Sequence, residues 1–73
     1  MVTFPERLKE VRKNNNSTQR QVAEMLGASE SQYQLYEYGK HKPNYEYIIK
    51  LCRYFNVSAD YLLGLTDEPR PLA

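Results

Sequence analysis

The sequence has few of the side chains that hold small folds together by covalent bonds or by metals. Among its 73 residues it has one cysteine, Cys52, which excludes an internal disulfide, and one histidine, His41. Structural zinc sites take four cysteine or histidine ligands, so this pair is too small a donor set. We expect a fold without a disulfide, a metal or another cofactor, stabilised by one core and by well-made helix ends.

Long apolar runs are also missing. No stretch approaches the roughly 20 apolar residues that a membrane helix needs. The opening MVTFPERLKEVRK enters charged residues without the apolar region of a secretory signal. Hydrophobic residues nevertheless make up 41% of the chain, too many for a disordered protein. These features predict a small soluble domain in the cytoplasm, without a membrane partner.

Patterns typical of enzymes are scarce as well. Cys52 falls on an apolar helical stripe, which is more typical of a small buried hydrophobe than of a nucleophile, and His41 lies in a different segment. The sequence contains neither a paired-carboxylate motif nor a glycine-rich phosphate loop. We therefore predict that the chain is not an enzyme, and no small-molecule ligand is evident.

Helix start signals, by contrast, recur along the chain. Three pairs match the capping box, in which two side chains satisfy exposed backbone N–H groups reciprocally. These pairs are Thr3 with Glu6, Thr18 with Gln21, and Ser29 with Gln32. Asn44 and Ser58 give two weaker starts, each with an acidic residue in the first turn, where the helix dipole favours it. Strand alternation is absent, so the sequence predicts an all-α fold with five helices.

The apolar spacing agrees with these starts. Two stripes repeat at helical intervals, and they consist of Phe4, Leu8 and Val11, and of Ile48, Leu51, Cys52 and Phe55. The expected connectors are residues 14–17, 27–28, 39–43 and 56–57. After Leu63 two prolines and mixed charge oppose a helix. We therefore assign residues 1–66 to the domain and residues 67–73 to a tail or linker stub.

The shortest connector, Gly27 with Ala28, forces two helices into a steep crossing. Gly27 can adopt the left-handed conformation that ends a helix, and Ala23, one turn earlier, leaves room for the next helix. In that arrangement three side chains of the next helix turn inward: Tyr33, Tyr36 and Glu37. Its outward face then consists of Glu30, Ser31, Gln34, Leu35 and Tyr38. A helix presented in this way fits the major groove of B-DNA, which predicts a helix-turn-helix.

These features carry a resemblance to a known family. The segment STQRQVAEMLGASESQYQLYEYGKHKP resembles the helix-turn-helix of the λ repressor and Cro type, also called XRE-like. With RLKEVRK before it and YIIKLCRYFNVSADYLLGLTDEP after it, the similarity covers residues 4–69. The resemblance implies a compact five-helix bundle. It also implies a transcriptional regulator in a bacterium or a phage-infected host, a repressor that binds a pseudo-palindromic operator as a dimer.

The resemblance also implies roles for individual residues. Contacts with the DNA backbone fall to Gln19, Gln32, Lys40 and Lys42, and contacts with base edges fall to Glu30, Ser31, Gln34 and Leu35. The side-chain chemistry fits unevenly: Gln34 can bond adenine N6 and N7, Glu30 can accept from cytosine N4, and Leu35 can contact a thymine methyl. His41, between the two lysines, fits an ordinary surface loop nearly as well as it fits a contact with the DNA backbone. For the outward residues, the alternative is an ordinary solvated helix face.

Charge supports DNA binding less clearly. The net charge is only +1, with seven basic and five acidic residues in 1–42 against three and four in 43–73. Phosphates repel Glu30 unless it reads a cytosine, and the face lacks arginine, the commonest reader of guanine. We expect modest affinity, an A/T-leaning site or readout of DNA shape. The alternative is a protein-interaction module on the same scaffold, an antitoxin or anti-repressor with weak or secondary DNA binding.

Two structural expectations follow from the same resemblance. Arg12 is expected to pair with Glu37 between the first and third helices, the alternative being two surface charges of little effect. Seven tyrosines are too many for so small a core, and the family commonly forms its two-fold contact through helices 4 and 5. We therefore expect a homodimer. The alternative is that tyrosine merely takes the place of leucine or lysine on a solvent-exposed surface. The expected contact residues are Tyr54, Asn56, Val57, Ala59 and Tyr61.

Overall fold

A computed structural model describes residues 2–70, and within that range it contains five helices and no strand. The helices are α1 (Phe4–Asn14), α2 (Gln19–Leu26), α3 (Glu30–Glu37), α4 (Tyr45–Phe55) and α5 (Ala59–Leu62). Each helix begins directly after one of the five predicted start residues. The all-α prediction is confirmed. None of these helices combines the length and apolar character needed to cross a membrane.

The helix starts are capped by side chains, as the sequence predicts. Thr3 and Thr18 form complete capping boxes. The side chains of Asn44 and Ser58 each accept a hydrogen bond from a backbone N–H of the first turn. These caps satisfy donors that a helix leaves unpaired at its start, which is why short helices form here.

The third predicted capping box forms only by half. The Ser29 hydroxyl accepts from the Gln32 backbone N–H at 3.1 Å. The Gln32 side chain, however, donates to the Tyr36 hydroxyl at 3.0 Å instead of returning to Ser29. The prediction of a reciprocal bond at Gln32 was therefore wrong, because a tyrosine one turn further along offers its amide a competing acceptor.

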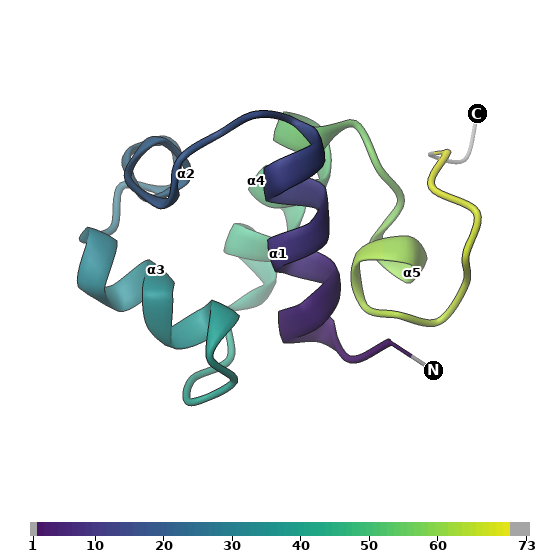
Figure 1. Ribbon diagram of the computed structural model, residues 1–73, viewed down its shortest axis with the longest axis horizontal. Coiled ribbons are helices and arrows are strands. Elements are labelled where there is room, and N and C mark those ends of the chain that lie inside the picture. The colour runs from purple at the N-terminus through teal and green to yellow at the C-terminus, as the bar shows by residue number, and fades with distance from the viewer. Residues whose placement is uncertain (1, 71–73) are drawn as a thin grey trace.

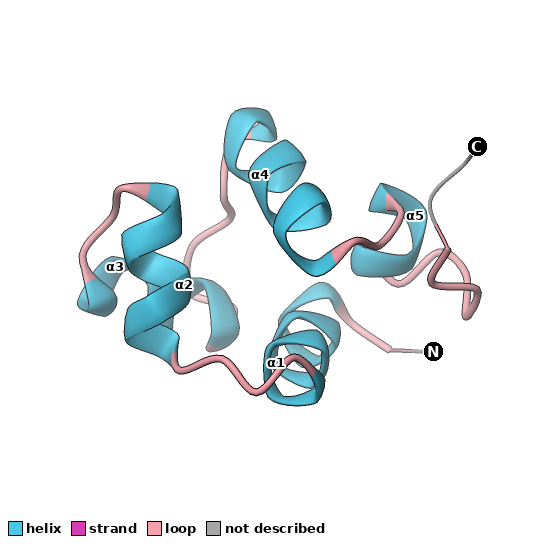
Figure 2. Ribbon diagram, turned by 90° about the horizontal axis from the view of Figure 1, so that it is seen from above, coloured by secondary structure: helices cyan, strands magenta, loops and turns pink. Residues whose placement is uncertain are grey.

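The helices surround a single core (Figures 1 and 2). Helix α1 runs through the middle of the molecule, with α2 and α3 on one side and α5 on the other. Helix α4 lies across from α1 in the view from above and packs on α2 and α5. The largest fully buried side chains are Leu8, Val22, Leu26, Tyr33, Leu51 and Leu62. Every helix contributes one or more of these residues, so no helix can leave without opening the core.

The tight connector between α2 and α3 has the predicted conformation. Gly27 caps α2 at φ +77°, in the left-handed region, and its N–H donates to backbone carbonyls of the last turn of α2. The Ala28 N–H adds a bond to the Ala23 carbonyl at 3.0 Å. The side chain of Ala23 is almost completely buried. The small residues at 23 and 27 thus allow α3 to pack directly on α2.

A buried arginine that no sequence motif marks, Arg7, holds the segment after α5. The Arg7 guanidinium donates to the Tyr61 carbonyl at 2.8 Å, to the Thr66 carbonyl at 3.2 Å and to the Asp67 carboxylate at 3.1 Å. The Ser58 N–H also donates to the Pro69 carbonyl at 3.0 Å. Part of the predicted tail thus lies against α1 and α5. The boundary at residue 66 stays a prediction, and residues 71–73 lie outside the described residues.

Candidate nucleic-acid interface

Helix α3 has the predicted two faces. Tyr33, Tyr36 and Glu37 turn inward and are 0%, 4% and 8% exposed. On the other face Glu30 and Ser31 are exposed, and Gln34 and Leu35 are partly exposed. At the end of the helix Tyr38 is 64% exposed. The four residues assigned to base contacts therefore share one accessible surface, while the contacts themselves stay predictions.

The inner face of α3 is anchored to α1 by the expected ion pair. The Arg12 Nε lies 2.6 Å from Glu37 Oε2, and Arg12 Nη2 lies 3.2 Å from Glu37 Oε1. The two side chains are 12% and 1% exposed. The Tyr33 hydroxyl donates to the same carboxylate at 2.6 Å. These bonds fix the rotation of α3 relative to the bundle.

The electrostatics of this cluster favour an ionised Glu37. Burial alone raises the pKa of Glu37, but hydrogen bonds from Arg12, Tyr33 and Gln19 outweigh burial and hold that pKa below its usual value. The bond to Glu37 raises the pKa of Arg12. Burial, followed by the bond to the carboxylate, raises the pKa of Tyr33. At neutral pH the cluster therefore contains one carboxylate, one guanidinium and one neutral phenol.

Two amides connect this cluster to the outward face. Gln19, the first residue of α2, donates through Nε2 to Glu37 Oε1 at 3.1 Å. Gln34 in turn donates through its own Nε2 to Gln19 Oε1 at 3.1 Å. We call Glu37, Gln19 and Gln34 the amide chain. The sequence pointed to Gln19 and Gln34 separately, but no sequence pattern indicated that they bond each other.

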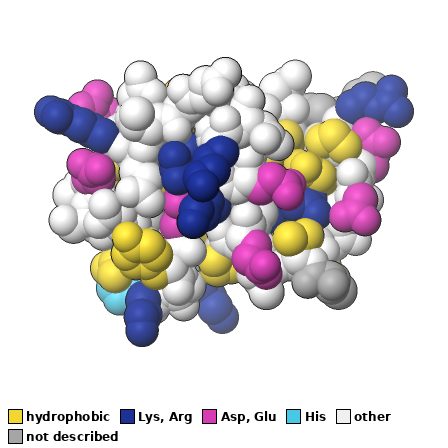
Figure 3. All heavy atoms as spheres, in the orientation of Figure 1, with side chains coloured by type: hydrophobic (Ala, Val, Ile, Leu, Met, Phe, Trp, Pro, Cys, Tyr) yellow, Lys and Arg dark blue, Asp and Glu magenta, His cyan; other side chains and the backbone are white. Residues whose placement is uncertain are grey.

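The basic loop that follows α3, residues 40–42, lies beside the outward face of that helix. Lys40, His41 and Lys42 are all exposed. The backbone N–H groups of Lys40 and His41 donate to the Leu35 carbonyl at 2.9 and 3.3 Å, which ties the loop to the end of α3. Figure 3 shows basic side chains projecting below the position that α3 and this loop occupy in Figure 1. The loop can thus carry positive charge along the edge of the α3 surface.

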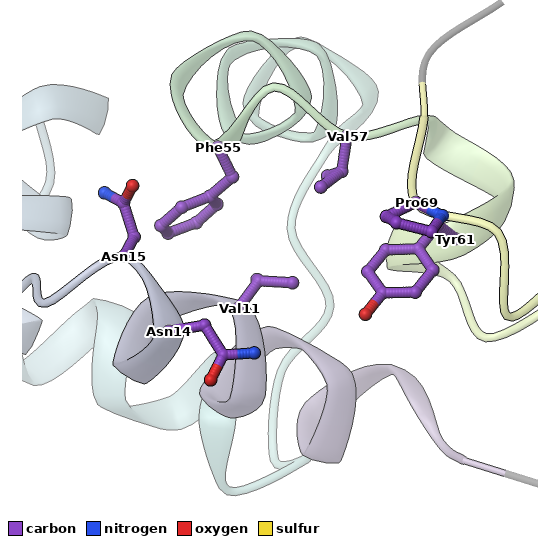
Figure 4. A pocket seen from close by; sticks show the side chains of 7 residues that line it. All are labelled: Val11, Asn14, Asn15, Phe55, Val57, Tyr61 and Pro69. Atoms are coloured by element: carbon purple, nitrogen blue, oxygen red, sulfur yellow. The ribbon is translucent and has the colours of Figure 1, made fainter.

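Residues assigned to the dimer contact divide into two groups. Tyr54, Asn56 and Ala59 are exposed, and the Tyr54 hydroxyl lies 3.2 Å from the Ser17 hydroxyl. Val57, only 9% exposed, instead faces a hollow of about 260 Å³ that Tyr61 also lines (Figure 4). The first three residues are available to a partner. Val57 is directed toward α1.

Tyr61 is occupied within the chain. Its ring covers the Arg7 guanidinium, with 3.8 Å between the guanidinium carbon and the ring centroid. Its hydroxyl donates to the Glu10 carboxylate at 3.2 Å. Burial and the bond to Glu10 raise the pKa of Tyr61. Tyr61 thus fixes α5 against α1 through Arg7 and Glu10, and only part of its side chain is accessible to a partner.

Comparison with known sequences finds relatives that are named as transcriptional regulators. The profile of a helix-turn-helix domain family matches residues 6–68. A Bacillus subtilis protein named as the uncharacterised HTH-type transcriptional regulator YobD is 42% identical over 68 residues, covering 93% of this chain and 61% of that protein. The transcriptional repressor RstR of a cryptic phage in Vibrio cholerae is 39% identical over 69 residues, covering 92% and 62%. The chain thus spans less than two thirds of these relatives.

Solved structures that superpose on this chain are also of a repressor and a transcriptional regulator. The P22 c2 repressor, determined in complex with a synthetic operator, superposes with a TM-score of 0.82 at 27% identity, covering 90% of this chain and all of that chain. A transcriptional regulator from Listeria innocua superposes with a TM-score of 0.81 at 32% identity, covering 92% and 64%. Each likeness covers at least nine tenths of this chain.

Proposed function

The chain belongs to the helix-turn-helix domain family, and from this premise we propose that it is a sequence-specific DNA-binding transcriptional regulator that inserts α3 into the major groove. The observation that carries the proposal is the arrangement of α3. Its inner face is held by the ion pair between Arg12 and Glu37. Its outer face presents mainly polar side chains to solvent, and we call this surface the reading face; it consists of Glu30, Ser31, Gln34 and Leu35. The major groove, about 12 Å wide, admits a helix held in this way and displays a distinct pattern for each base pair.

The surroundings of α3 fit contacts with the DNA backbone. Gln19 stands at the positive end of α2, where side chain and helix dipole both suit a phosphate. Lys40 and Lys42 are exposed in the loop that follows α3, and each can neutralise one phosphate. Gln32, exposed on α3, is a fourth candidate. Backbone contacts from the start of α2 and from the loop after α3 would hold α3 in register with the groove.

The reading face itself suits A/T-rich sites. Gln34 matches adenine, Leu35 matches a thymine methyl, and Ser31 can bond either kind of base. Glu30, exposed in the first turn, fits a cytosine N4 amino group and is otherwise repelled by phosphates. Because none of these residues is an arginine, we propose modest affinity with some dependence on DNA shape.

We further propose that the protein is a repressor that acts in the cytoplasm as a homodimer. RstR is named a repressor, and the P22 c2 repressor was determined with an operator, which supports the same activity here. The dimer contact would use the exposed residues Tyr54, Asn56 and Ala59. Val57 and Tyr61, which are less exposed, would pack behind them. Two-fold symmetry would place the reading helices on half-sites about 34 Å apart. Repression would follow from occlusion of the promoter.

Binding rather than catalysis accounts for the remaining chemistry of the chain. Cys52 is half-buried on α4, and burial raises the pKa of its thiol. A reactive cysteine needs the opposite shift, because the thiolate is the nucleophile. We therefore assign Cys52 a packing role.

The proposal can be tested by titrating the chain against a pool of random duplexes at low and raised salt. We expect enrichment of a pseudo-palindromic site and an affinity that falls steeply with salt, because phosphate contacts release counterions. Sedimentation at several concentrations, with and without the enriched duplex, tests the dimer. A species that stays monomeric in both conditions would exclude the two-fold arrangement.

A second candidate function is a protein-interaction module on the same scaffold. Specific observations favour it: Glu30 is exposed on the reading face, the net charge is only +1, and Tyr45 on α4 is 74% exposed. Exposed tyrosines are enriched at protein interfaces. The same titration separates the two candidates, since an interaction module would show weak DNA binding without a preferred sequence.

A further inference from the structure

We infer that Glu37, the last residue of α3, whose side chain is buried against α1, determines which base Gln34 reads. The inference rests on the proposed DNA-binding function and deepens it. Glu37 acts as a positioning residue, because its effect passes through Gln19. The geometry behind it is the amide chain, in which two successive hydrogen bonds of 3.1 Å run from the buried carboxylate to the reading face.

The direction of the amide chain follows from its first member. An ionised carboxylate only accepts hydrogen bonds, whereas an amide carries both a donor and an acceptor. Gln19 must therefore turn its Nε2 toward Glu37, which leaves its Oε1 facing Gln34. That oxygen also only accepts, so Gln34 must turn its Nε2 toward Gln19. Each amide is oriented by the group before it.

The first member is itself fixed. Glu37 accepts from Arg12 Nε and Nη2, from the Tyr33 hydroxyl and from Gln19. Its side chain is 1% exposed, so water does not compete for these bonds. The ion pair with Arg12 keeps the carboxylate charged, and a charged acceptor makes the stronger kind of hydrogen bond. The orientation of Gln19 is therefore built into the folded chain before DNA binds.

The orientation of Gln34 decides what it offers to a base. With one N–H donated to Gln19, its free edge presents Oε1 and the second N–H. That acceptor and donor match the N6 amino group and the N7 atom of adenine. A reversed Gln34 would accept from Gln19 through Oε1, which would turn its Nε2 toward the base. The two N–H donors of that nitrogen match N7 and O6 of guanine. The buried carboxylate thus favours adenine over guanine.

The test compares the full chain with the variant Glu37→Gln. Glutamine at 37 can donate as well as accept, so the amide chain is free to reverse. The affinity is measured for two duplexes of the selected site that differ only at the pair read by Gln34, identified as the position whose preference is lost in Gln34→Ala. We expect the wild type to favour A·T over G·C by roughly 5- to 150-fold. In Glu37→Gln this ratio should fall toward or below one, with preferences at other positions retained.

Two further variants make the result specific. Glu24→Gln removes the same charge from an exposed site on α2, where Glu24 pairs with Arg20, and should change the affinity for both duplexes alike. Gln19→Ala removes the middle of the amide chain but leaves Arg12, Glu37 and Tyr33 in contact. It should bring the ratio close to one even if overall affinity falls. This variant carries the test if Glu37→Gln proves too unstable to fold.

The outcomes distinguish this inference from the proposed function. A wild type with no sequence preference would overturn the proposed function and the inference with it. A wild type that prefers adenine, together with a folded Glu37→Gln or Gln19→Ala variant that keeps the full ratio, would overturn the inference alone. A wild type that prefers guanine at this pair would also overturn it while leaving the DNA-binding function intact.

Discussion

Arg12 and Glu37 stand 25 residues apart in the sequence, yet Arg12 Nε lies 2.6 Å from Glu37 Oε2 and joins α1 to the last residue of α3. Both side chains are largely buried. The pair therefore determines how α3 is rotated on the bundle, and through Gln19 it also reaches the surface proposed to meet DNA.

Replacement of Arg12 should be costly. In Arg12→Ala the Glu37 carboxylate would stay buried without its cation, and we expect the free energy of unfolding to fall by about 3 kcal/mol. Arg20→Ala is the matched control, because Arg20 and its partner Glu24 are 77% and 67% exposed. That change should cost less than about 1 kcal/mol. Urea denaturation measures both, and equal small losses would contradict the anchoring role of Arg12.

The stability of the fold should decrease in acid because of Glu37. Its pKa in the folded chain lies below the ordinary value of 4.5, so the unfolded state binds the proton more readily. The contribution is fully present above that ordinary value and is lost as pH falls through the folded pKa. We expect the free energy of unfolding to decline less steeply with acid in Glu37→Gln than in the wild type. Parallel declines would show that Glu37 is not the responsible group.

Two glycines with similar backbone angles should differ in their tolerance of alanine. Gly27 has φ +77° and nothing within 4 Å of an added Cβ, so Gly27→Ala should cost about 1 to 2 kcal/mol from left-handed strain alone. Gly64 has φ +82°, and there a Cβ would lie 2.4 Å from the Val2 carbonyl oxygen. Gly64→Ala should therefore lower the thermal midpoint further. The opposite order would contradict the close approach of Val2 to the turn that follows α5.

Lys40 should affect all DNA sequences equally. If it neutralises one phosphate, Lys40→Ala should weaken binding to selected and unselected duplexes alike and reduce the salt slope by about 1. Lys50 on α4, outside the proposed contact set, provides a charge-matched control, and Lys50→Ala should leave the slope unchanged. A loss confined to one sequence would instead assign Lys40 to a base.

Local signals explain why so much of the fold could be predicted. Thr18 and Ser29 start helices and Gly27 ends one, and each acts through backbone groups within four residues. These helix ends can therefore be predicted from the sequence. The inward position of Tyr33 and Tyr36 likewise follows from helical spacing. The left-handed conformation of Asn56 was not predicted, although the connector was, because asparagine only tolerates that conformation and does not require it.

Long-range contacts account for what sequence reasoning missed. Arg7 bonds groups 54 to 60 residues away, so nothing near it in the sequence marks it as a buried clamp. The bond between Gln34 and Gln19 joins two helices and depends on their crossing geometry. Gln32 illustrates the converse case, since a local motif predicted that its side chain would return to Ser29, but that side chain donates to the Tyr36 hydroxyl instead. Competition among partners is settled only in the folded chain.

The proposed function requires that the outward face of α3 is the surface that meets DNA. Backbone amide signals of the isotope-labelled chain, followed by NMR during titration with the selected duplex, test this directly. We predict the largest shifts at Gln19, at residues 30–35 and at residues 40–42. Shifts confined to α4 and α5, with α3 unchanged, would contradict it.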